Sequence, residues 1–139
     1  MALARAAELG CTTLQFFSHN PRGWQLKPLS SKDAELFRKT RLETGMSPVF
    51  IHTSYLINLA SQNPELLRKS AEMVAEELRI ADAIGAEYVV LHTGSASGDD
   101  PAEARKRAID ALSRIAGQGP FTARLLLENT AGSSPDALP

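Results

Sequence analysis

The chain has 139 residues, of which 43% are hydrophobic and 22% charged, and its net charge is −1. This composition excludes a disordered segment and fits one modest globular domain, without a basic excess that would indicate nucleic-acid binding by charge alone. The single cysteine, Cys11, excludes an internal disulfide framework, so we expect a reducing compartment and a free thiol in the core. Because the sequence has no apolar run of 18 residues and no signal-peptide pattern, we expect a cytoplasmic protein without membrane contact.

Helix and strand patterns alternate along the chain. Apolar spacing, capping residues and stop glycines predict helices from Ala2 to Leu9, from Ser30 or Ser31 to about Glu43, from Pro64 to Gly85, and from Asp100 to about Ala116. Short apolar or β-branched runs predict strands over 12–17, 48–51, 88–91 and 125–128. The predicted order is therefore a helix followed by a strand, and this pair occurs four times.

Strands that alternate with helices indicate a parallel sheet, and right-handed crossovers in one direction place the helices on one outer face. A complete TIM (β/α)8 barrel of this kind usually has about 250 residues. We therefore predict an α/β fold, a partial TIM barrel of about four parallel strands. It would form a single domain over residues 1–139, the N-terminal-to-central half of a barrel truncated at both ends.

Three side chains that can bind a metal follow three consecutive predicted strands. His52, His92 and Glu128 are separated by 40 and 36 residues, about the length of one strand–loop–helix unit. Since the carboxyl ends of parallel strands meet at one edge of a sheet, we expect these side chains to lie together. Two imidazoles and a carboxylate suit zinc, with water in the open position. One such histidine alone would more often be structural, as we expect for His19, but the repetition favours a metal site.

Four segments extend this interpretation: His52-Thr53-Ser54-Tyr55-Leu56-Ile57-Asn58-Leu59, Leu91-His92-Thr93-Gly94-Ser95, Leu127-Glu128-Asn129-Thr130-Ala131-Gly132 and the loop Asn20-Pro21-Arg22-Gly23-Trp24. They resemble signature segments of the endonuclease IV family, the zinc-dependent AP endonucleases (deoxyribonuclease IV) of base-excision repair. The resemblance implies a TIM barrel with up to three zinc ions that cuts DNA 5′ of an abasic site. It also implies that His52 and His92 each bind one zinc, that Glu128 bridges this zinc to a second and serves catalysis, and that the other ligands lie in the later half of the barrel.

The same resemblance implies double-stranded DNA with abasic sites as the partner and a monomeric full-length protein. It assigns DNA contacts to Arg22, Tyr55 and Leu56. An arginine can reach phosphate or the minor groove, and an aromatic with an aliphatic side chain can unstack a base step. The alternatives are loop packing for Tyr55 and Leu56 and a solvated charge for Arg22.

Small departures from the family pattern are Thr53 in place of Asp, Thr93 in place of Pro, and Ser133-Ser134 in place of Gln-Gly. None removes a ligand, but each changes contacts around the metal or the shape of a loop. Two other functions stay open: a metal-dependent sugar isomerase or epimerase of the same barrel superfamily, and an inactive fragment. Enzymes that act on small sugars lack the loop wedge, so the predicted DNA-contacting residues argue against them.

Overall fold

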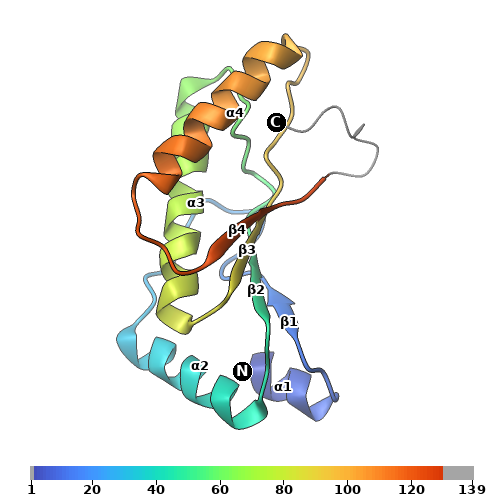
Figure 1. Ribbon diagram of the computed structural model, residues 1–139, viewed down its shortest axis with the longest axis vertical. Helices are drawn as coiled ribbons and strands as arrows, with labels where there is room; N and C mark the ends of the chain where they lie inside the picture. The colour runs from blue at the N-terminus through green and yellow to red at the C-terminus, as the bar shows by residue number, and fades with distance from the viewer. Residues whose placement is uncertain (1, 130–139) are drawn as a thin grey trace.

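The computed structural model describes residues 2–129, in which helices and strands alternate as predicted (Figure 1). The helices are α1 (Ala2–Glu8), α2 (Ser31–Thr44), α3 (Pro64–Ile84) and α4 (Pro101–Ala116), and the strands are β1 (Leu14–Phe16), β2 (Val49–His52), β3 (Tyr88–Leu91) and β4 (Arg124–Leu127). Residues 130–134, which belong to the third signature segment and to one departure from the family pattern, lie outside the described residues.

The four strands form one parallel sheet in the order β1-β2-β3-β4. Phe50 of β2 lies opposite Tyr88 of β3, and Tyr88 lies opposite Arg124 of β4. Figure 1 shows α3 and α4 side by side along the sheet, with α2 across its lower end. Sequential parallel strands joined through helices are the arrangement of a TIM barrel, so the predicted partial barrel is confirmed.

Local sequence signals set the ends of the helices. Ser30, Asn63 and Asp100 cap α2, α3 and α4, and each side chain accepts a hydrogen bond from a backbone N–H of the first turn. Gly45 and Gly85 end α2 and α3 in the left-handed region, with φ of 66° and 74°. The bounds therefore agree with the predicted ones to within one or two residues, except that β1 pairs only over Leu14–Phe16.

The core lies between the sheet and the helices, and Ile51, Leu91 and Ile115 are among its most deeply buried side chains. On α3, apolar residues spaced by three and four positions face the core: Val74, Leu78 and Ala81 are buried, whereas Leu67 and Ala71 are only half-buried. The buried side of α3 also includes the polar residues Ser70 and Glu77. A helix contacted by α2, α4 and β3 buries a wider stripe than a helix that covers a sheet alone.

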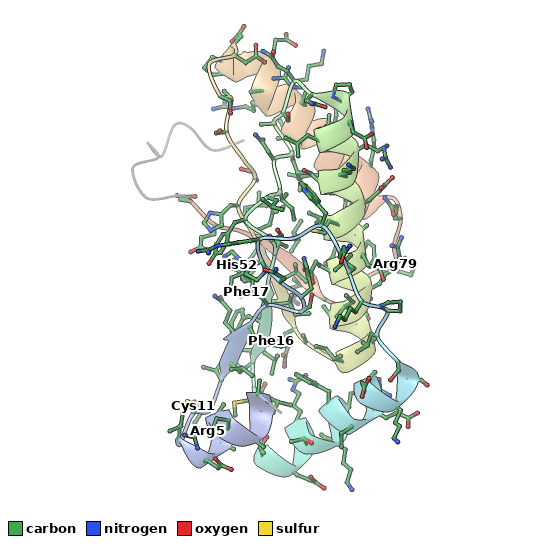
Figure 2. The ribbon with its side chains drawn as sticks, turned by 180° about the vertical axis from the view of Figure 1, so that it is seen from behind. Arg5, Cys11, Phe16, Phe17, His52 and Arg79 are labelled. Atoms are coloured by element: carbon green, nitrogen blue, oxygen red, sulfur yellow. The ribbon has the colours of Figure 1, made fainter. Side chains whose placement is uncertain are left out.

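The expectation of a core thiol is wrong, because Cys11 is exposed. Cys11 follows Gly10 in the turn between α1 and β1, and β1 begins only at Leu14, so this residue precedes the part of the strand that packs on the core. Figure 2 shows Cys11 near Arg5 of α1 and far from His52. Within residues 2–129, none of the helices combines the length and apolarity needed to cross a lipid bilayer.

Candidate metal centre

The register of the sheet puts the three predicted ligands on one face. His52 lies opposite Val90 of β3, and Val90 lies opposite Leu126 of β4. Side chains alternate between the two faces of a sheet, so His92 and Glu128, each two residues beyond those partners, share the face of His52. The register therefore determines both the edge and the face on which these groups meet.

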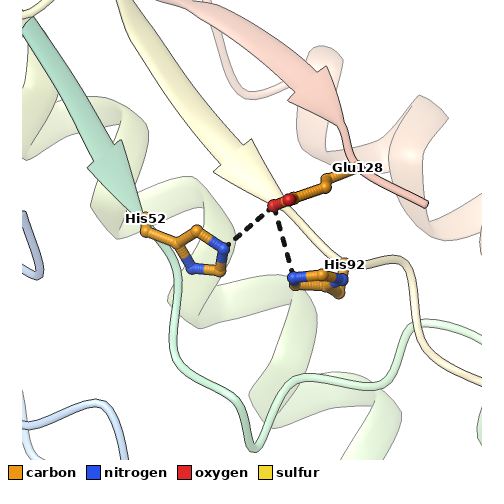
Figure 3. A group of neighbouring side chains, drawn as sticks. All are labelled: His52, His92 and Glu128. Atoms are coloured by element: carbon orange, nitrogen blue, oxygen red, sulfur yellow. Dashed lines mark hydrogen bonds and ion pairs between the residues drawn. The ribbon is translucent and has the colours of Figure 1, made fainter. Parts of the chain in front are cut away.

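His52, His92 and Glu128 converge at the carboxyl end of the sheet (Figure 3). Glu128 Oε2 lies 3.2 Å from Nε2 of His52 and 3.3 Å from Nε2 of His92. One ligand atom from each residue lies within 4.8 Å of the other two. The expectation that these side chains lie together is confirmed as geometry, while the ligand role of each residue remains a proposal.

The three side chains form a site that is open on one side. The side chain of His52 is 7% exposed, that of His92 is 30% exposed and that of Glu128 is 50% exposed. His52 is thus held inside the protein, and Glu128 stands on the solvent side. A catalytic zinc site keeps one coordination position open to water or substrate, and this arrangement leaves room for one.

The hydrogen bonds of His52 fit a cation. Its Nδ1 lies 2.9 Å from the backbone oxygen of Thr53, which can only accept, so Nδ1 carries the proton. In the neutral ring Nε2 then offers a lone pair, and it faces the carboxylate oxygen of Glu128 at 3.2 Å. Two acceptors at this distance need a proton or a cation between them, and a histidine oriented by a carbonyl at Nδ1 is the usual form of a metal ligand.

The loops that carry the predicted DNA contacts are bonded to each other beside this site. The backbone oxygen of Pro21 accepts hydrogen bonds from Ser54 Oγ at 2.9 Å and from the Tyr55 N–H at 3.1 Å. Arg22 therefore lies next to the segment that holds Tyr55 and Leu56. Arg22 is exposed, Tyr55 is 61% exposed and Leu56 is half-buried.

Aromatic contacts connect Tyr55 to the histidines. The Phe17 ring lies 5.2 Å from the His52 ring and 5.3 Å from the Tyr55 ring, between ring centroids. The rings of His52 and Tyr55 are 5.9 Å apart. Tyr55 is therefore exposed beside the metal residues, and Leu56 is half-buried on the same loop; their contact with DNA stays a prediction.

Sequence reasoning missed a second polar cluster, formed by Ser18, His19 and Glu77. Ser18 Oγ donates to Glu77 Oε2 at 2.6 Å, and His19 Nδ1 lies 3.0 Å from Glu77 Oε1. Burial raises the pKa of Glu77 to about 7 and lowers the pKa of His19. His19 thus contacts α3 and is not part of the His52–His92–Glu128 group. Only the position of Ser18 and His19 after a predicted strand could have pointed to this cluster.

A sequence model of the family described as xylose isomerase-like TIM barrel matches residues 3–136. The chain is 43% identical to a probable endonuclease 4 of Persephonella marina over 111 residues, which are 80% of this chain and 39% of that protein. It is 42% identical to a probable endonuclease 4 of Methanosphaerula palustris over 134 residues, which are 94% of this chain and 47% of that protein. The chain thus spans less than half the length of these curated relatives.

The same likeness holds in three dimensions. The crystal structure of endonuclease IV from Thermus thermophilus superposes with a TM-score of 0.79 and 41% sequence identity, over 96% of this chain and 47% of that one. The family model matches nearly all of the chain, and the relatives that align with the same residues are named probable endonuclease 4. The chain therefore belongs to the xylose isomerase-like TIM barrel family, and within it to the endonuclease IV group.

Proposed function

We propose that this chain is the metal-binding part of a zinc-dependent endonuclease of base-excision repair, which hydrolyses the DNA phosphodiester 5′ of an abasic site. The observation that carries the proposal is the convergence of His52, His92 and Glu128 next to the exposed Tyr55. A site of two imidazoles and one carboxylate that opens toward solvent suits a phosphate group as substrate.

Each residue has a distinct part in this proposal. The Nε2 atoms of His52 and His92 and the carboxylate of Glu128 would hold zinc. When bound, zinc supplies a Lewis acid that polarises a phosphoryl oxygen. The carbonyl of Thr53 keeps the His52 ring in the tautomer that offers Nε2 to the site. Glu128, being half-exposed, can reach both the site and a water molecule beside an incoming phosphate.

The two bonded loops would hold the DNA. Arg22 projects from one loop and can pair with a backbone phosphate, and Tyr55 with Leu56 can enter the gap left by a missing base. Pro21 joins the two loops through its carbonyl, so their side chains would meet the duplex as one rigid surface. The net charge of −1 means that such local contacts, not overall charge, would bind the DNA.

The remaining parts of the proposal concern the whole protein. We propose that the full-length protein is located in the cytoplasm. We also propose that it is a monomer, because a closed barrel leaves no free strand edge for association. Up to three zinc ions would be bound there, although within residues 2–129 only one group of His, Asp, Glu or Cys side chains could hold a metal. We therefore expect the 139-residue chain by itself to cut abasic DNA much more slowly than a complete barrel.

A chimera tests the function directly. This chain would replace the matching segment of Thermus thermophilus endonuclease IV, and the product would be assayed for nicking of a duplex with one abasic site and of the undamaged duplex. We expect zinc-dependent cleavage of the damaged duplex only. Glu128→Gln should lower the rate by more than the roughly 10–100-fold that follows the loss of a supporting partner.

Glu72→Gln is the matched control, since it makes the same chemical change at a carboxylate on α3 that is 61% exposed. It should cleave like the unmodified chimera. Equal cleavage by the Glu128→Gln and Glu72→Gln chimeras would remove Glu128 from the mechanism. A chimera that folds and binds zinc, but turns over ketose sugars and not abasic DNA, would favour the isomerase or epimerase alternative.

A further inference from the structure

The loop that follows His92 makes an unusually close contact with the loop that follows His52. Gly94 has φ of +109°, and a Cβ at this position would lie 2.7 Å from Asn58 Cγ and 2.8 Å from Asn58 Cα. Real Cβ atoms do not approach other atoms this closely. Because one of the opposing atoms belongs to the backbone, the contact requires glycine and cannot be relieved by turning the Asn58 side chain alone.

Hydrogen bonds hold the same two loops together. Asn58 Nδ2 donates to the backbone oxygen of Ser95 at 3.2 Å, and the Leu59 N–H donates to the backbone oxygen of Thr93 at 2.9 Å. Asn58 Oδ1 accepts from the Ala60 N–H at 2.9 Å, which fixes the side chain in this orientation. The contact between residues 58–59 and 93–95 therefore has a defined geometry on both sides.

Asn58 is in turn fixed to a helix. Its backbone N–H donates to Ser70 Oγ at 3.0 Å, and Ser70 lies fully buried within α3. A continuous series of contacts thus runs from α3 through Asn58 and Leu59 to Thr93, the residue after His92. Tyr55 and Leu56 lie three and two positions before Asn58 on the same loop.

We propose that Asn58 and Gly94 are positioning residues that set the place of His92 and of the loop with Tyr55 and Leu56 at the same time. This inference rests on the proposed function, because it assumes that His92 binds a metal. His92 needs such support: its Nδ1 is buried and has no hydrogen-bond partner within the described residues, so no bond at that nitrogen fixes the orientation of the ring. Besides the His52 ring, whose centroid lies 5.1 Å away, and Glu128 at Nε2, the position of the ring then depends on the backbone after His92.

The chain offers a matched control for this proposal. Gly98 lies in the same loop with φ of +89°, but a Cβ there would meet nothing within 4 Å. Gly94→Ala and Gly98→Ala therefore impose the same kind of backbone strain, since both positions lie in the left-handed region. Only Gly94→Ala also separates the two loops, so the difference between the variants reports the contact.

The experiment measures Zn²⁺ affinity by chelator competition and the visible spectrum of bound Co²⁺ for the wild-type chain, Gly94→Ala, Asn58→Ala and Gly98→Ala. We expect Gly94→Ala and Asn58→Ala to lower Zn²⁺ affinity by about 10–100-fold and to change the Co²⁺ spectrum at saturation. Gly98→Ala should match the wild type in both. Amide hydrogen exchange of Leu59, without metal, should become faster in Gly94→Ala than in Gly98→Ala.

The outcomes separate this inference from the proposed function. If the wild type binds Zn²⁺ and the Gly94→Ala and Gly98→Ala variants bind it with equal affinity, the positioning role is overturned and the metal site stands. A wild-type chain that keeps its fold but binds neither ion would overturn both. Faster exchange at Leu59 with unchanged metal binding would show that the loops are joined but that His92 does not depend on them, which also overturns the proposal.

Discussion

Replacing Glu77 with glutamine should make the free energy of unfolding less dependent on pH. Glu77 is fully buried on α3, where Ser18 and His19 are its polar neighbours. Burial, with a smaller effect of the nearby Glu76 carboxylate, raises the pKa of Glu77 from 4.5 to about 7, and the hydrogen bond from Ser18 partly opposes this rise. The native carboxyl is therefore protonated at mildly acidic pH.

The sign of the effect follows from proton binding. Between pH 4.5 and about 7 the native protein keeps a proton on Glu77 that the unfolded chain releases, so stability falls as the pH rises through this window. A pKa that rises from 4.5 to about 7 on folding corresponds to a loss of roughly 3 kcal/mol between about pH 4 and about pH 8. The lowered pKa of His19 acts in the opposite direction below pH 6.5.

Urea unfolding of the wild type and of Glu77→Gln at about pH 5 and about pH 8 separates these contributions. The neutral amide imitates the protonated carboxyl, so the two proteins should be similarly stable at the lower pH. At the higher pH the variant should exceed the wild type by up to about 3 kcal/mol. The control is Glu72→Gln, the same chemical change at an exposed carboxylate of α3 paired with Arg68, which should change stability by less than about 0.5 kcal/mol at both pH values. If the free energy of unfolding falls by the same amount between the two pH values in the wild type and in Glu77→Gln, the assignment of a buried, protonated Glu77 is refuted.

Four further substitutions follow from burial, capping and exposure. Leu91→Ala, at a fully buried position of β3, should lower the free energy of unfolding by about 2–5 kcal/mol in urea titrations. Asn63→Ala removes the cap of α3 and should lower it by about 1 kcal/mol. Tyr55→Ala should change stability by less than about 0.5 kcal/mol but weaken binding of an abasic duplex roughly tenfold in fluorescence anisotropy. The exposed Cys11 should react with a thiol reagent in the native protein, and Cys11→Ser should abolish this reaction without loss of stability. Resistance of Cys11 to the reagent, or a large loss of stability in Tyr55→Ala, would contradict the exposures described above.

Much of the fold could be predicted from the sequence because the informative signals are local. Asn63 followed by Pro64 begins α3, and Gly85 ends it, through hydrogen bonds and backbone angles within a few residues. Apolar runs between such signals mark the strands, of which β2 and β3 are mostly buried, whereas β4 is largely exposed. The grouping of the metal residues could be predicted by the same reasoning, since His52 and His92 directly follow two of those apolar runs.

Burial of single residues could not be predicted in the same way. In the sequence Glu77 is one of several charges on α3, and its burial depends on the chain after β1 crossing the helix at Ser18 and His19. Cys11 is an apolar residue type, but its exposure depends on where pairing in β1 begins. The contact of Gly94 with residue 58 likewise joins two loops that are distant in sequence, and no local pattern reports it.

Zinc titration of the chain itself tests the central claim most directly. The protein, freed of metal, would be titrated with Zn²⁺ in a calorimeter and compared with His52→Ala, His92→Ala and Glu128→Ala, with His19→Ala as the histidine outside the group. We predict one strong site per chain, lost or weakened by more than about 10–100-fold in the first three variants and retained in His19→Ala. The assignment of His52, His92 and Glu128 as a metal centre would be contradicted by a folded wild-type chain that binds no zinc. It would also be contradicted if all four variants bound zinc with the same affinity.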